Sequence, residues 1–225
     1  MSQTKQLRAI DGFAFGTYEA MPKTKPRGGI VVIQEIFGVN SHIRNVCDGY
    51  AAAGYAAIAP QIFDRVERNV EMGYEQKDMV RGVEIARGKL KMEQTLQDLQ
   101  ASIDDAKRHG KVGVVGYCFG GLVAAACAVN AADTFSAAVS YYGGGTVGIV
   151  GNGVPGIPLM MHFGERDAHI PVSDVDTIKT AWADADISLY EADHGFNCDQ
   201  REAFSAVPAA IAQARTFRFF DTHLG

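Results

Sequence analysis

The sequence predicts an α/β fold in which a mostly parallel central sheet is flanked by helices on both faces. Short β-branched runs alternate along the chain with segments of helical periodicity, and repeated strand–helix units of this kind build parallel sheets. No internal repeat or low-complexity tract interrupts the alternation. We therefore expect a single domain that spans residues 1–225.

The composition is that of a globular chain with a full core. Of the 225 residues 47% are hydrophobic, and 21 basic against 26 acidic residues leave a formal net charge of −5. Disorder needs low hydrophobicity and high net charge. Nucleic-acid binding needs clustered Lys and Arg, and a bilayer span needs about 20 consecutive apolar residues. We therefore expect neither a nucleic acid nor a membrane as a partner.

The first half of the chain predicts three strands. Residues 28–35 (GGIVVIQE) are a run typical of a strand buried on both faces. Asn40 or Ser41 then caps a helix that Gly54 closes, and residues 55–60 follow as a strand. Residues 61–74 are polar and irregular. Residues 75–108 are expected to be largely helical with a break near Gly88, and in the second half residues 96, 99, 103 and 106 form one apolar face. Residues 111–117 are the third strand.

The second half continues the alternation. The expected elements are a small-residue helix (119–130), a strand (136–142), a flexible loop (143–156), a strand (158–164), a helix (172–184), a strand (187–192) and a closing helix (201–220). In parallel sheets of this kind, functional residues gather at the carboxyl ends of the strands. We therefore examine the residues that follow each strand.

A glycine-flanked cysteine follows the third strand. GYCFGG (116–121) gives G-x-C-x-G around Cys118, which is the nucleophile-elbow pattern with Cys in place of Ser. The start of the following helix would favour a thiolate, and the N–H of Phe119 could bind a developing oxyanion. The alternative is a core cysteine at a tight turn.

An acid and a base follow the next two strand ends. Asp167 lies three residues beyond one strand and His194 lies in the loop after the next. The chain order Cys118, Asp167, His194 is the nucleophile–acid–base order of α/β-hydrolases. We expect His194 to activate the thiol and Asp167 to fix the imidazole tautomer. Alternatively, Asp167 caps a turn and His194 is an ordinary loop histidine. His169, close to Asp167, could also reach the site.

The motifs as a set are similar to those of one family. They are QEIFG (34–38), AP-x-IF (59–63), GYCFGG (116–121), YYGGG (141–145), the G-x-x-D of 164–167 and HGF (194–196). In these the chain resembles the dienelactone hydrolases (carboxymethylenebutenolidases) of the α/β-hydrolase superfamily, from about Gly29 to Phe220. A cysteine nucleophile combined with QEIFG is much more specific than either feature alone.

The resemblance implies further site residues. Glu35 would be the additional active-site carboxylate that helps to activate the cysteine, and Ile36 would supply the second oxyanion N–H. Arg65 would bind a substrate carboxylate with its guanidinium fork. As ordinary residues, Glu35 would be a helix-entry or surface side chain and Arg65 a solvated loop arginine.

The chain departs from the family pattern after the histidine. The family has a second arginine four residues on, where this chain has Cys198. We expect Arg201 either to fill that role or to lie in the first turn of a helix. One of Tyr141 and the tyrosine after it should line the pocket, with Tyr141 as the candidate.

The expected function is hydrolysis of a lactone or activated ester. The substrate would be a dienelactone, and the reaction would pass through a thioester on Cys118. The alternatives are a broad carboxylesterase or thioesterase on the same fold, a ligand receptor that has lost turnover, and a thiol redox protein that uses Cys118 and Cys198.

The expected partner is a small, anionic substrate. His194 and Cys198 alone do not make a metal site, so we expect no metal and no cofactor. The four cysteines form no C-x-x-C pair, and residues 1–12 lack an apolar segment, which favours a cytoplasmic protein. We expect a monomer or a small homo-oligomer.

Overall fold

The computed structural model describes residues 1–131 and 133–225, which divide into two compact units, Met1–Val112 and Gly113–Gly225. The expectation of a single domain stays a prediction. Among the described residues, no helix has the length and apolar character that crossing a membrane requires.

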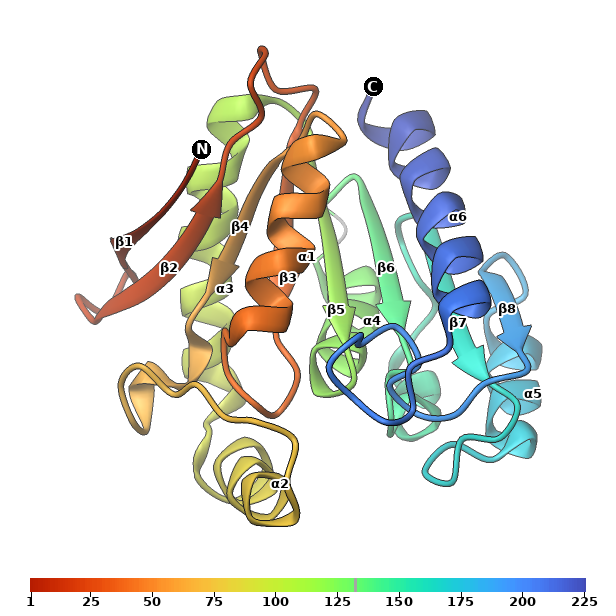
Figure 1. Cartoon of the computed structure of the whole chain (residues 1–225). Helices are drawn as coiled ribbons and strands as arrows, with labels where there is room; N and C mark the ends of the chain where they lie inside the picture. The colour runs from red at the N-terminus through yellow and green to blue at the C-terminus, as the bar shows by residue number, and fades with distance from the viewer. Residues whose placement is uncertain (132) are drawn as a thin grey trace. The chain divides into compact units, whose positions relative to one another are not determined.

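The first unit is a four-stranded sheet between helices. Its strands are β1 (Ser2–Arg8), β2 (Ala14–Ala20), β3 (Gly29–Ile33) and β4 (Ala56–Pro60), in the order β1-β2-β4-β3. β3 and β4 are parallel, with Gly29 opposite Ala56, whereas β1–β2 and β2–β4 are antiparallel. Helices α1 (Ser41–Ala52) and α3 (Met92–Ala106) lie on opposite faces of the sheet (Figure 1).

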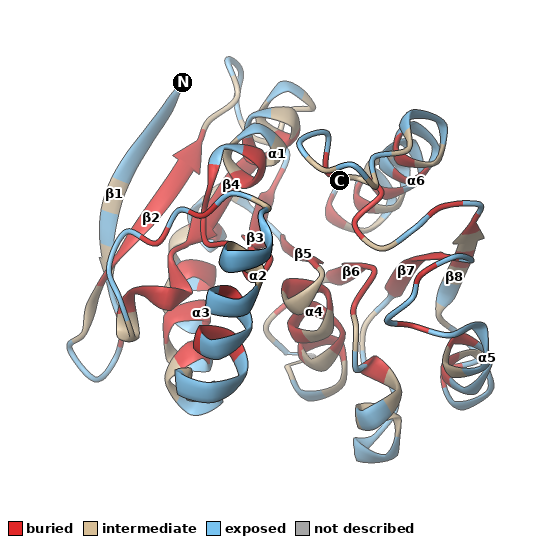
Figure 2. Cartoon of the chain, turned by 60° about the horizontal axis from the view of Figure 1, so that its bottom comes forward, coloured by how far each residue is buried: buried red, intermediate tan, exposed pale blue. Residues whose placement is uncertain are grey.

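The strands of the second unit are all parallel. Strands β5 (Val112–Tyr117), β6 (Ala137–Tyr141), β7 (Leu159–Gly164) and β8 (Asp186–Tyr190) pair in that order. α6 (Ala206–Leu224) covers one face, and α4 (Phe119–Asn130) and α5 (Val172–Ala181) cover the other (Figure 1). The central strands are buried, whereas the outer faces of the helices are exposed (Figure 2). This agrees with the buried parallel strands that the apolar runs predict.

Several elements differ from the sequence expectation. The β1–β2 hairpin was not expected. The break expected near Gly88 is present, since residues 75–108 divide into α2 (Gln76–Val83), a π-helical segment (Glu84–Lys89) that contains Gly88, and α3. The closing helix begins at Ala206 instead of Arg201. Turns precede it as far as Ser205, whose N–H donates to the Phe196 carbonyl at 3.0 Å. A 3-10 helix also occupies Thr146–Asn152, within the expected flexible loop.

Candidate active site

Cys118 lies at a strained turn between β5 and α4. Its φ of 53° is in the left-handed region, which non-glycine residues rarely occupy. The turn also needs Gly116, because a Cβ there would lie 1.8 Å from the carbonyl oxygen of Gly120. The Cys118 N–H donates to the Tyr141 carbonyl at 3.0 Å, which ties the turn to β6. The cysteine is partly exposed, at the start of a helix, where the macrodipole favours negative charge.

His194 lies within hydrogen-bond distance of both Cys118 and Asp167. Its Nε2 is 3.2 Å from the Cys118 Sγ, and its Nδ1 is 2.7 Å from an Asp167 carboxylate oxygen. Cys118 follows β5, Asp167 follows β7 and His194 follows β8, in keeping with a site at the carboxyl ends of the strands.

Asp167 is held rigidly. Its side chain is fully buried, and its second oxygen accepts from the backbone N–H groups of His169 at 2.8 Å and Ile170 at 3.2 Å. Because the donors of its own loop fix one oxygen, the other stays directed at His194. The sequence interpretation of Asp167 as a turn cap is therefore also correct, since the carboxylate does both.

His194 favours its protonated form. Burial lowers its pKa, but the hydrogen bonds to Asp167 and Cys118 outweigh burial and raise the pKa to about 10. The imidazole is therefore cationic at neutral pH, beside the sulfur. A cation next to a thiol favours the nucleophilic thiolate. The arrangement can form a thiolate–imidazolium pair and can later transfer one proton.

Tyr142, rather than Tyr141, packs against His194. The rings of Tyr142 and His194 are 5.2 Å apart in an edge contact. Tyr141 is 1% exposed, stacks on Tyr117, and its hydroxyl lies 2.7 Å from the Thr216 Oγ1. Tyr142 lies just beyond β6 and has a φ of 37°, and its ring is 6.2 Å from that of Tyr141. The expectation that Tyr141 lines the pocket stays a prediction.

Arg65 is held by carboxylates of its own unit. Its guanidinium pairs with Asp98 at 2.7 Å and with Asp11 at 2.6 Å, and its side chain is only 5% exposed. The hydrogen bonds to Asp98 and then to Asp11 raise its pKa. The fork that we expected to bind a substrate carboxylate is therefore already occupied, which indicates a structural role for Arg65.

Arg201 lies beside the loop that carries His194. A Cβ built on Gly195 would come within 2.3 Å of its guanidinium Nη1, so the guanidinium rests against the Gly195 backbone. Gly195 has a φ of 83°, which glycine adopts readily, and as a glycine it has no side chain to obstruct the contact with Arg201. Arg201 is partly exposed. It precedes α6 instead of lying in the helix's first turn, as the sequence alternative had it.

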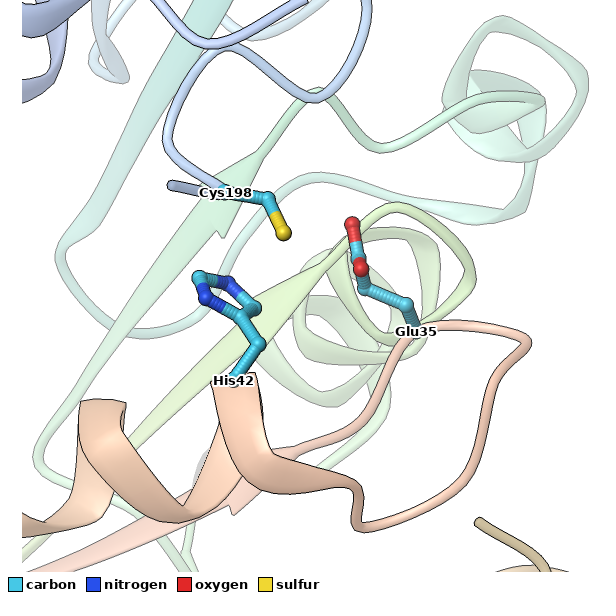
Figure 3. A group of neighbouring side chains, drawn as sticks. All are labelled: Glu35, His42 and Cys198. Carbon is cyan, nitrogen blue, oxygen red and sulfur yellow. The ribbon is translucent and has the colours of Figure 1, made fainter. Parts of the chain in front are cut away.

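The other predicted site residues belong to loops after strands or to a helix start. In the first unit, Glu35 and Ile36 follow Gln34 in the loop after β3 and are 1% and 9% exposed. In the second unit, Phe119 is the first residue of α4. Figure 3 shows the Glu35 side chain on its loop. The buried Glu35 is not the surface residue of the alternative interpretation.

Two further side chains drawn in Figure 3 are buried. His42 belongs to the first turn of α1, and Cys198 belongs to the turn after His194, where its N–H donates to the Gly195 carbonyl at 2.9 Å.

Sequence reasoning missed one buried histidine and left a second open. His162, fully buried within β7, hydrogen-bonds through both ring nitrogens. A polar residue within an apolar strand was the available signal. His169 is exposed, and its ring lies 5.2 Å from that of His194, edge to face. The proximity of His169 to Asp167 in sequence left this contact open as an alternative.

Comparison with known proteins identifies the family. The family model described as "Dienelactone hydrolase family" matches residues 15–224. A Synechocystis sp. protein named "Putative carboxymethylenebutenolidase" is 37% identical over 218 residues, which are 87% of this chain and 86% of the relative. The carboxymethylenebutenolidase of Pseudomonas putida is 30% identical over 223 residues, 95% and 93% of the two chains.

A solved structure agrees with these relatives. It carries the description "Putative Dienelactone Hydrolase from Klebsiella pneumoniae", is 29% identical, and matches with a TM-score of 0.84 over 98% of this chain and 99% of that one. The fold class and the family that the motifs indicated are therefore confirmed. The chain is a hydrolase with an α/β-hydrolase fold, and it belongs to the dienelactone hydrolase family.

Proposed function

We propose that this hydrolase cleaves a lactone or activated ester, specifically a dienelactone of the carboxymethylenebutenolide type, through a thioester on Cys118. The observation that carries the proposal is the continuous hydrogen-bonded line from Asp167 through His194 to the Cys118 sulfur, at 2.7 and 3.2 Å. The names of the relatives support the substrate class.

In the first half-reaction the Cys118 thiolate attacks the carbonyl carbon. A C–S bond forms, and the carbonyl π electrons move to oxygen. The N–H groups of Phe119 and Ile36 are the proposed oxyanion donors, each contributing about 3 kcal/mol in comparable sites. Collapse breaks the C–O bond of the ester. The departing enolate or alkoxide takes the proton of the His194 imidazolium.

In the second half-reaction neutral His194 takes a proton from water as that water attacks the thioester. Collapse of the tetrahedral intermediate breaks the C–S bond and releases the acid and the thiolate. The imidazolium beside the thiolate is restored, so protons and electrons balance over the cycle. The role that the resemblance gives to Glu35 is to accept the thiol proton whenever Cys118 is protonated.

A broad carboxylesterase or thioesterase is the second candidate. It is favoured by one observation, which is that Asp98 and Asp11 already occupy the guanidinium of Arg65. Arg201, the other arginine expected to bind an anionic substrate, is the proposed contact. The anionic substrate preference is therefore a proposal that depends on Arg201.

Mass spectrometry after brief exposure to substrate tests the covalent step. An acyl adduct should appear on Cys118, and C118A should show neither adduct nor turnover. C198S is the matched control and should retain hydrolysis. An adduct on Cys198, or turnover by C118A, would contradict the mechanism. Tight binding without product over hours would instead identify a receptor.

Comparing kcat/KM for an anionic enol-lactone and a neutral aryl ester distinguishes the two hydrolase candidates. A preference for the enol-lactone that R201Q removes supports the dienelactone proposal. A preference for the neutral ester supports the broad esterase.

We further propose that the protein acts in the cytoplasm as a monomer or small homo-oligomer, which gel filtration and cell fractionation test.

A further inference from the structure

A chain of buried polar side chains lies between α6 and the face of the sheet that α6 covers in the second unit. His162 on β7 lies at its centre, with its Nδ1 2.8 Å from the Tyr190 hydroxyl and its Nε2 3.0 Å from the Thr216 Oγ1. The Thr216 Oγ1 in turn lies 2.7 Å from the Tyr141 hydroxyl. His162 and Thr216 are wholly buried. The proposed mechanism gives none of these groups a chemical step.

The donors at one end favour one direction for the chain. Arg215 has only donors, and its guanidinium reaches the Ser188 hydroxyl and, at 3.5 Å, the Tyr190 hydroxyl oxygen. A hydroxyl that accepts from Arg215 keeps one proton to donate, and we infer that this proton points to the Nδ1 of His162.

A neutral imidazole with one accepting nitrogen carries its proton on the other. The Nε2 of His162 therefore donates to Thr216. Burial, and then the charge of Arg215, lower the pKa of His162 to about 3, in keeping with a neutral ring.

The backbone of the same residues contacts one member of the proposed triad directly and the loop of a second. The Tyr141 carbonyl accepts from the Cys118 N–H at 3.0 Å. The Tyr190 carbonyl accepts at 2.8 Å from the N–H of Glu165, two residues before Asp167.

His194 is reached through the neighbouring strand end. The His162 carbonyl accepts at 2.8 Å from the N–H of Tyr142, whose ring packs against His194. The side-chain hydrogen bonds of the polar chain thus join β6, β7 and β8. Asp167 follows β7 and His194 follows β8, whereas the Tyr141 carbonyl that accepts from the Cys118 N–H lies at the end of β6.

We propose that His162, held as its Nε2–H tautomer between Tyr190 and Thr216, is a positioning residue that fixes the ends of β6, β7 and β8 and thereby the geometry of the Cys118–His194–Asp167 triad. This inference rests on the proposed function of the triad. Displacement of reacting groups by about 1 Å can cost on the order of a hundredfold in rate.

Isosteric removal of single hydroxyls tests the proposal. T216V removes the acceptor of the His162 Nε2–H, and Y190F removes the donor to its Nδ1. Each should lower kcat by about tenfold or more with KM changed by less than about twofold. Each should also slow the alkylation of Cys118 by iodoacetamide and shift its pH profile. T216S, which keeps the hydroxyl, should restore both readouts.

T177V is the matched control. Thr177 is exposed on α5, and its hydroxyl bonds only within its own helix, to the Ser173 carbonyl at 2.9 Å. It should leave kcat, the alkylation profile and the melting temperature unchanged.

Long-range ¹H–¹⁵N spectra of the unmodified protein test the tautomer without any variant that could fail to fold. His162 should show a protonated Nε2 and an unprotonated Nδ1. The opposite tautomer, or wild-type kcat and alkylation in both T216V and Y190F, would overturn the proposal. The spectra and the alkylation need no substrate. Turnover by C118A would instead refute the proposed function by itself.

Discussion

Acidification should destabilise this protein through one buried histidine. His162 is completely buried, and its environment lowers its pKa to about 3, chiefly because burial penalises the cation and also because Arg215 is nearby. In the unfolded chain a histidine has a pKa of about 6.5. Between these two pH values His162 binds a proton in the unfolded chain but not in the folded chain. The stability that neutral His162 provides is therefore present above pH 6.5 and lost progressively as the pH falls toward 3.

The size of the effect follows from linkage. Each pH unit within that window costs about 1.4 kcal/mol per proton taken up on unfolding. From pH 7 to pH 5 the unfolded histidine goes from mostly neutral to almost fully charged, which amounts to about 2 kcal/mol. Carboxyl groups with ordinary pKa values near 4 titrate little in this range, so the effect of His162 is separable from theirs.

Urea denaturation followed by circular dichroism at pH 7 and pH 5 measures the effect. The free energy of unfolding of the wild type should fall more than that of H162Q, by about 2 kcal/mol. T177V is the control, because Thr177 is exposed and does not titrate, and its free energy of unfolding should fall as much as that of the wild type. Equal pH dependence in H162Q and wild type would refute the reasoning, whatever the absolute stability of the variant.

Three other predictions follow from described contacts. D98N should cost about 3 kcal/mol of stability in urea denaturation, because it breaks a buried ion pair and leaves the Arg65 guanidinium undercompensated. G116A should abolish soluble folding or lower the melting temperature sharply, because its Cβ would overlap a backbone carbonyl. The pKa of His194 is raised to about 10, so the stability it contributes is complete below pH 6.5 and should be lost as the pH rises toward 10. H194Q should lack this loss between pH 7 and pH 9 in the same assay.

Each of these has a matched comparison. D11N removes the half-exposed partner of Arg65 and should cost less than D98N. Gly148 has open space around it, so G148A should fold normally where G116A does not. Equal losses within either pair, or the same alkaline loss in H194Q as in wild type, would contradict the corresponding argument.

The sequence by itself determined the parallel α/β architecture, the family and the order of the candidate triad. The family follows from the resemblance of the motifs, and the other two follow from local rules. A β-branched run with no polar face has to lie between two helical layers, and a cysteine flanked by glycines between strand and helix has to form a tight turn. Residues that follow parallel strands gather at one sheet edge by topology alone, which is why Asp167 and His194 could be chosen without coordinates.

The tertiary structure alone decided which polar groups are already occupied. Arg65 matches the expected motif, but Asp98 lies 33 residues away and Asp11 lies 54 residues away in sequence, and no local pattern indicates that they neutralise it. The same holds for Tyr141, whose hydroxyl contacts Thr216 of α6, and for His162, whose partners come from β8 and α6. Periodicity predicts the face on which a side chain lies, whereas its hydrogen-bond partners depend on packing between segments that are distant in the chain.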